Sequence, residues 1–118
     1  KQPKIFATNT SAEYWRGDAT LAHVDTSGKT DLAEHPSTRR YLFSSAQHTP
    51  GAPGQSRTNP GTGTTARYPL CVLDYLPLLR AALINLDRWI VDGIAPPPSA
   101  QPGAWPNRCA TVGNSRWK

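Results

Sequence analysis

The sequence has no methionine and few aliphatic side chains, and this shortage limits the core that it can build. Leu, Ile, Val and Phe make up 20 of the 118 residues, a share typical of chains with poor core-forming capacity. Because twelve of those 20 lie between Leu70 and Ile94, the remaining chain has too little apolar surface to offset the entropy of ordering it. We therefore expect either much irregular structure or a chain that is part of something larger, and we favour the second.

Long apolar runs and metal-ligand spacings are also missing. No stretch of 18 apolar residues occurs, so we expect no membrane span. Cys71 and Cys109 have no Cys-x-x-Cys spacing and no nearby pair of histidines, which argues against zinc, and we expect neither a metal nor a cofactor. One disulfide fits an exported protein, whereas two free thiols fit a cytoplasmic one, so the compartment stays open. A chain without an initiator Met and without a signal-peptide core is what an internal fragment or a processed product shows.

Basic charge is present but scattered. The formal net charge of the whole chain is +5, divided into −1 for residues 1–35 and +6 for residues 36–118. Arg39 and Arg40 form the one adjacent pair of arginines, and no Lys/Arg run or aromatic–basic motif occurs. These charges favour a solvated basic surface, and we expect no nucleic-acid partner.

Two short apolar runs predict a pair of strands, at Lys4–Thr8 and Arg40–Ser44. The first run does not alternate with polar residues, which is typical of parallel strands covered on both faces. A cap signal at Asn9-Thr10-Ser11 then predicts a short helix that contains Glu13. We expect the two strands to pair in parallel, with the link from Thr8 to Arg40 as a crossover.

The strongest secondary-structure signal predicts a helix over Asp74–Asp92. Asp74 is a suitable N-cap, and Pro77 falls in the first turn, where a missing N–H costs nothing. Gly93 favours a left-handed cap, and the following prolines forbid continuation. One apolar stripe recurs at three- and four-residue spacing and is expected to cover a face of the sheet; it consists of Leu76, Leu79, Leu83, Leu86 and Ile90.

Two segments show no regular period. Residues 49–69 contain four Pro, four Gly and five Thr in 21 positions, which predicts a long flexible loop without its own core. Residues 99–118 show neither a helical nor a strand period and are predicted to form an irregular tail.

A carboxylate and a histidine follow the two predicted strands and are the candidate catalytic residues. Glu13 comes five residues after Thr8, and His48 comes four residues after Ser44. In an acid–histidine–nucleophile site the histidine acts as general base and then as general acid, while the carboxylate orients it. Asp18 is the reserve acid. Alternatives stay open, because Glu13 also suits the first turn of a helix and His48 also suits a solvated loop.

Four segments of the chain resemble the C-terminal segment of a family of bacterial alpha/beta-hydrolase domain proteins. They are Asn9–Asp25, Tyr41–His48, Leu73–Arg80 and Leu86–Gly93, and the resemblance covers about residues 3–98. It implies that Lys4–Thr8 and Arg40–Ser44 are the seventh and eighth strands, Glu13 the triad acid, His48 the triad base, and Asp74–Asp92 the final helix.

The chain departs from this family in two places. The family has a Gly-Thr-Gln-His approach to its histidine, where this chain has Ser45-Ala46-Gln47-His48. Residues 99–118 match no part of the family pattern.

The nucleophile is the missing member of the site. No Gly-x-Ser-x-Gly elbow and no Gly-rich oxyanion loop occur in the sequence, although acyl transfer depends on both. We therefore expect residues 1–98 to be the C-terminal part of an α/β-hydrolase domain. It would act on a small ester or acyl substrate together with the remainder of that domain, which would supply the serine.

Two alternatives belong to other functional classes. One is a small basic module without catalytic activity that docks through its amphipathic helix. The other is a partly disordered chain that folds on a partner.

Overall fold

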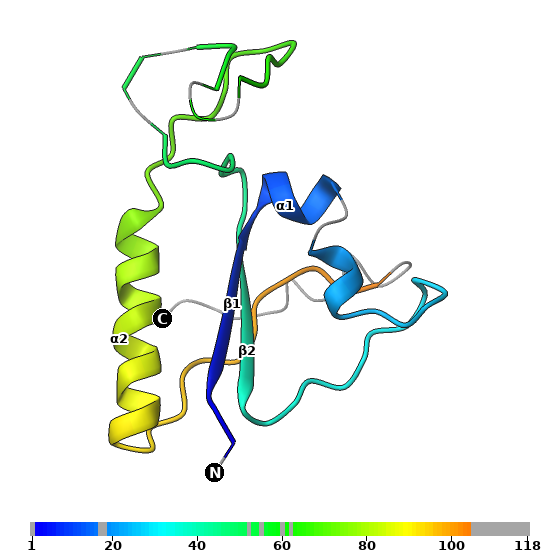
Figure 1. Cartoon of the computed structure of the whole chain (residues 1–118), viewed down its shortest axis with the longest axis vertical. Helices are drawn as coiled ribbons and strands as arrows, with labels where there is room; N and C mark the ends of the chain where they lie inside the picture. Colours follow the sequence, from blue (N-terminus) through cyan, green and yellow to red (C-terminus); the bar gives the residue numbers. More distant parts are fainter. Residues whose placement is uncertain are drawn as a thin grey trace, which may run out of the picture.

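The computed structural model describes residues 2–16, 19–51, 53–54, 56–59, 61 and 63–104. Its elements, in chain order, are β1 (Ile5–Thr10), α1 (Ser11–Arg16), a 3₁₀ turn (Thr20–Ala22), β2 (Thr38–Phe43) and α2 (Leu76–Val91). In Figure 1, α2 lies alongside the two strands and runs in the opposite direction, and α1 follows the upper end of β1. The described residues thus form a mixed α/β arrangement with a two-stranded sheet and one main helix.

The two strands pair in parallel, as the sequence predicts. The register runs from Ile5 opposite Thr38 to Thr10 opposite Phe43. Both strands are displaced slightly from their predicted bounds, since β1 continues to Thr10 and β2 begins at Thr38. Because the strands are parallel, their carboxyl ends meet at the same edge of the sheet, and the segments that carry the two candidate catalytic residues both start there.

The outer edge of β2 is covered by the first residues of the predicted irregular tail. The backbone N–H of Ala100 donates to the carbonyl of Arg40 at 2.9 Å, and the N–H of Leu42 donates to the carbonyl of Ala100 at 2.9 Å. These bonds form an isolated parallel bridge between Tyr41 and Ala100. Residues 105–118 of the tail lie outside the described residues.

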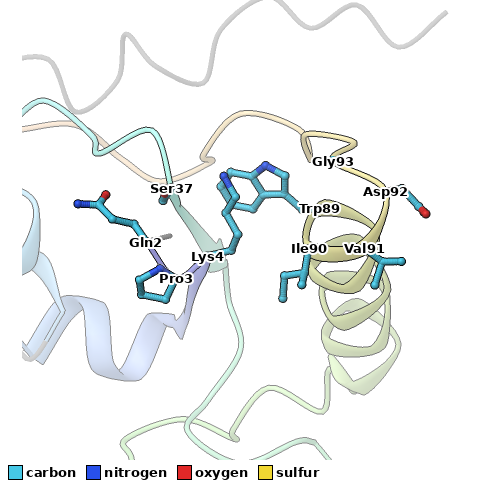
Figure 2. Close-up of a pocket in the computed structure, with 9 residues that line it drawn as sticks. All are labelled: Gln2, Pro3, Lys4, Ser37, Trp89, Ile90, Val91, Asp92 and Gly93. Atoms are coloured by element: carbon cyan, nitrogen blue, oxygen red, sulfur yellow. The ribbon is translucent and has the colours of Figure 1, made fainter.

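Trp89 anchors α2 to the sheet. Its side chain is 5% exposed, and its ring centroid lies 5.9 Å from that of Phe6. The Lys4 ammonium lies 4.3 Å from the indole centroid and the Arg39 guanidinium 4.9 Å. Figure 2 shows the Lys4 side chain lying against the indole. Such cation–π contacts add to the burial of the ring, so the end of α2 is held against the starts of both strands.

The predicted helix stripe is wrong in part, because α2 is rotated toward Trp89. Leu79 and Leu86 are half-buried as expected, but Leu83 is 65% exposed and Ile90 is 56% exposed. Leu76 is exposed as well. The physical reason is that an indole buries more surface than any aliphatic side chain. The side of α2 that carries Trp89 therefore faces the narrow sheet, and the side that carries Ile90 does not.

The ends of α2 follow the predicted signals with one correction. Tyr75, rather than Asp74, is the N-cap residue, and it makes no side-chain cap bond. Asp74 instead accepts the backbone N–H of Leu76 at 2.9 Å, so it ties down the turn that precedes the helix. At the other end Gly93 has a φ of 71°, which is the left-handed cap predicted from the sequence.

The Pro/Gly/Thr segment is irregular, and its described residues are organised by hydrogen bonds around Asn59. This side chain is buried, and its amide donates to Gln47 Oε1 and to Thr49 Oγ1 at 3.0 Å each. Its carbonyl oxygen accepts the N–H of Gly61 at 2.8 Å. A polar side chain therefore provides a centre for the segment where the sequence predicts no core.

Candidate active site

Glu13 is placed by a capping box at the start of α1. The buried Thr10 ends β1, and its backbone N–H donates to Glu13 Oε2 at 2.7 Å. The Thr10 hydroxyl bonds to the same oxygen and accepts the N–H of Ala12 at 3.3 Å. This reciprocal Thr-x-x-Glu pattern satisfies donors at the helix start that would otherwise lack partners. It also fixes the carboxylate, with Oε2 used by the cap and Oε1 available to another group.

His48 is placed by a turn that follows β2. Ser45 adopts a left-handed φ of 64°, and its N–H donates to the hydroxyl of Ser11 at 2.9 Å. Ala46 is buried. The Tyr75 hydroxyl donates to the carbonyl of His48 at 2.8 Å. The histidine backbone is therefore tied to α1 on one side and to the start of α2 on the other.

The structure brings Glu13 and His48 together in a hydrogen bond between Oε1 and Nδ1. An ionised carboxylate only accepts, so Nδ1 carries the proton, and in the neutral ring Nε2 keeps its lone pair. No polar atom of the described residues bonds Nε2. The His48 side chain is 53% exposed and that of Glu13 is 20% exposed, so the basic nitrogen is accessible while the acid behind it is shielded.

A small groove lies beside this pair at the carboxyl ends of the strands. Its volume is about 250 Å³, and its walls include residues of β1, β2 and α2 together with both candidate catalytic residues. In open α/β sheets this end of the strands is where ligands bind. The residues that line it are Thr8, Asn9, Thr10, Glu13, Phe43, His48, Tyr75 and Leu79.

Electrostatics keep the acid ionised and the neighbouring phenol protonated. Partial burial alone raises the pKa of the Glu13 carboxyl, but hydrogen bonds from Thr10 and His48 outweigh it and lower the pKa from 4.5 to about 2. Burial raises the pKa of the Tyr75 phenol, and the charge of Glu13 adds to this effect. At neutral pH Glu13 therefore accepts bonds as a carboxylate, while Tyr75 remains a donor to His48.

A larger cavity of about 810 Å³ lies at the opposite end of the sheet (Figure 2). It is lined by the residues that precede the strands and by the last turn of α2 with Gly93. Its lining holds the polar side chains of Gln2, Lys4, Ser37 and Asp92 but no histidine. The acid–histidine pair is therefore separate from this cavity, and the chemistry-bearing groove is the smaller one.

A second histidine–carboxylate pair, His23 and Asp31, has a structural rather than a catalytic arrangement. His23 is 3% exposed, its Nδ1 lies 3.1 Å from Asp31 Oδ1, and its Nε2 lies 3.0 Å from the Tyr14 hydroxyl. Tyr14 also donates to the carbonyl of Pro102 at 2.8 Å, and Asp31 accepts the N–H of Ala104. Because both ring nitrogens are bonded within the protein, His23 joins α1 to the tail and offers no nitrogen to a substrate.

Among the described residues, His35 and Cys71 take no part in the pair. Asp18, the reserve acid, lies outside the described residues. His35 is an exposed loop residue whose Nδ1 accepts the N–H of Ser37 at 3.1 Å. Cys71 is exposed, and Cys109 lies outside the described residues.

Neither a metal-binding cluster nor a membrane-spanning helix occurs among the described residues. Within them, no group of three or more His, Cys, Asp or Glu side chains is arranged to hold a metal ion. The part of the chain that the structure describes also contains no helix with the length and apolarity needed to cross a bilayer.

Two residues at the site were not identified from the sequence. The sequence places Thr10 only within a general cap signal, although the Thr-x-x-Glu spacing to Glu13 is the capping-box signature that predicts its role. No local sequence signal points to Tyr75, because its bond to the carbonyl of His48 joins positions far apart in the sequence.

Comparison of the chain with family models, with curated proteins and with solved structures found no match in any of the three. The resemblance to alpha/beta-hydrolases and the catalytic roles of Glu13 and His48 therefore stay predictions.

Proposed function

We propose that this chain is the C-terminal part of a serine-type α/β-hydrolase that cleaves a small ester or related acyl substrate. The observation that carries the proposal is the Glu13–His48 hydrogen bond at the carboxyl ends of two parallel strands. It supports the role of Glu13 as the triad acid and that of His48 as the triad base. The nucleophilic serine and the oxyanion donors would come from the remainder of the domain, upstream of this chain.

In the proposed reaction His48 moves the proton while Glu13 stays ionised. Nε2 accepts the proton of the serine hydroxyl as the serine oxygen attacks the ester carbonyl, and it returns this proton to the departing alcohol. A water molecule then repeats the sequence and releases the acid and the serine. Throughout, Glu13 accepts a hydrogen bond from Nδ1–H of His48 and stabilises the imidazolium that forms during each transfer.

The test uses the complete protein that contains this chain, assayed with p-nitrophenyl esters of increasing acyl length. We expect His48→Ala to lower kcat/KM by about 10⁴-fold or more, because it removes the general base. Glu13→Gln keeps the ring but loses the ionised partner, and should leave a reduced remnant of activity. His35→Ala is the matched control, since His35 is an exposed loop histidine whose ring bonds only the N–H of the nearby Ser37 among the described residues.

The proposal is contradicted if hydrolysis does not depend on His48. Activity that survives His48→Ala at the level of the His35→Ala control would remove His48 from the mechanism. The coding sequence upstream of Lys1 provides a separate check, because we expect it to encode a Gly-x-Ser-x-Gly elbow preceded by βα units.

A non-catalytic module that docks through its helix is the second candidate function. The observation that favours it is the set of exposed apolar side chains on α2, of which Leu83 and Ile84 are 65% and 59% exposed. The ester assay discriminates the two functions, because a docking module would show no hydrolysis that depends on His48.

A further inference from the structure

The exposed side of α2 carries a pattern that repeats every seven residues. Leu76, Leu83 and Ile90 form one apolar row, and all three are exposed. Seven residues are close to two turns of an α-helix, so members of a row lie nearly above one another. Ile84 and Val91, which are 59% and 72% exposed, form a second row at the same spacing.

Between the two apolar rows lies a pair of opposite charges, Arg80 and Asp87. At 100° per residue these side chains project between the directions of Leu83 and Ile84. Both are exposed, and among the described residues neither forms an ion pair. Their seven-residue separation, about 10 Å along the axis, prevents them from bonding each other within one helix.

This pattern is complementary to itself when the helix is reversed. If two copies of α2 pack antiparallel with Leu83 against Leu83 of the other copy, Leu76 falls opposite Ile90. Arg80 then lies within one residue of the position opposite Asp87, on the same flank of the seam. In a parallel pair, the two-fold axis would put this flank of one helix on the opposite side of the seam from the same flank of its partner, so that Arg80 and Asp87 would not meet. Charges beside an apolar seam set the orientation of paired helices in this way, and a two-fold axis uses the same patch on both copies.

We propose that the exposed side of α2 is a homodimer interface, in which two copies of the chain pack antiparallel through Leu76, Leu83 and Ile90 and are aligned by two Arg80–Asp87 ion pairs. A contiguous exposed apolar surface of this kind is unusual on a monomer and marks an interaction site. The charges select a second copy as the partner, because the patch complements itself about a two-fold axis. The inference does not depend on the proposed hydrolase activity, since the Glu13–His48 pair lies on other elements.

The first test measures the mass of the full 118-residue chain by sedimentation equilibrium over a range of protein concentrations. We expect reversible association to twice the chain mass of 12.8 kDa. Arg80→Asp should weaken dimerisation by about tenfold or more, because it places like charges opposite each other twice in the symmetric dimer. The double variant Arg80→Asp/Asp87→Arg reverses both charges and should restore wild-type association. Arg88→Asp, on an exposed position away from the seam, is the matched control.

The second test locates the two-fold axis by cross-linking. In a chain with Cys71→Ser and Cys109→Ser, Leu83→Cys should form a disulfide-linked dimer on oxidation, because position 83 meets itself at the axis. Ala81→Cys, also exposed but on another side of α2, should remain uncross-linked.

Three results would overturn the proposal. The chain could remain a monomer at every concentration, or the dimer could keep its affinity in Arg80→Asp. Association of undefined size that the charge reversals do not change would show general stickiness rather than a specific interface.

Discussion

At the scale of single residues, the carboxylate of Glu13 connects local structure to the candidate chemistry. Its oxygen Oε2 completes the helix cap with Thr10, and its oxygen Oε1 holds His48. The same side chain therefore fixes the start of α1 and the orientation of the imidazole. Replacing it changes both, so a test of its role needs a readout of the ionised carboxylate itself.

The pH dependence of folding provides that readout. Since the Glu13 pKa is lowered from 4.5 to about 2 in the folded chain, its contribution to stability is complete above about 4.5 and is lost as the pH falls toward 2. We expect a carbon-detected NMR titration of the Glu13 carboxyl to show a midpoint near 2. In Glu13→Gln the acid-induced loss of the β1 amide signals over this range should be smaller. A carboxyl midpoint near 4.5 would contradict the hydrogen-bonded arrangement.

Gly51 fixes the chain just after His48 through close packing. A Cβ at this position would lie 2.1 Å from the carbonyl carbon of Val72, and the Gly51 N–H donates to the carbonyl of Leu73 at 2.9 Å. Gly51→Ala should therefore push the segment away from the residues before α2, and the downfield Nδ1–H signal of His48 should weaken or disappear. Pro53→Ala is the control, because Pro53 is an exposed residue of the same segment. An unchanged His48 signal in Gly51→Ala would show that this contact does not position the histidine.

At the scale of elements, local signals predicted which segments form, and long-range contacts decided how they pack. The sequence predicts the strands because their apolar runs are bounded by turn residues. It predicts the end of α2 from Gly93, which adopts the expected left-handed conformation. The face of α2 that meets the sheet was not predictable from spacing alone. Apolar side chains occur on more than one side of α2. Which side faces the sheet is decided by the contact of Trp89 with Phe6.

At the candidate site too, local sequence signals predicted some features, whereas contacts between distant segments could not be predicted. The order of a strand, a carboxylate, a second strand and a histidine predicted that Glu13 and His48 lie at one end of a parallel sheet, and the structure places them there. The bond from Tyr75 to His48 and the pairing of Ala100 with β2 each join segments with no shared sequence pattern. Such contacts become visible only once the chain is folded.

Adjacent positions on α2 provide a matched pair of substitutions. Trp89 is 5% exposed and Ile90 is 56% exposed, so their truncations should differ sharply. Trp89→Ala removes the anchor between helix and sheet and should destabilise the fold by about 3–5 kcal/mol, whereas Ile90→Ala should change stability by less than about 1 kcal/mol in the monomer. Amide exchange in β1, measured at low protein concentration, checks this difference. Equal effects of the two substitutions would contradict the observed rotation of the helix.

At the scale of the whole molecule, the described residues enclose very little apolar core. The buried apolar residues are Tyr14, Ala46, Tyr75, Trp89 and Ala104. The sheet has two strands in the order β1–β2, so the other edge of β1 has no strand beside it among the described residues. An open edge and an apolar helix side are both surfaces that further protein usually covers.

The folding behaviour of the isolated chain should reflect this small core. Each large apolar side chain left uncovered forgoes about 1.5–3 kcal/mol relative to full burial, and the remaining core is too small to make unfolding strongly cooperative. At protein concentrations where the chain is monomeric, we expect a broad thermal transition by circular dichroism and strong binding of the dye ANS, which reports exposed apolar surface. The same residues within the larger hydrolase domain that we propose should unfold in a sharper transition and bind little dye, because the remainder of that domain would cover the β1 edge. A sharp transition of a monomeric isolated chain, with no dye binding, would show that these 118 residues are a self-sufficient domain and would remove the basis for assigning them to a larger hydrolase.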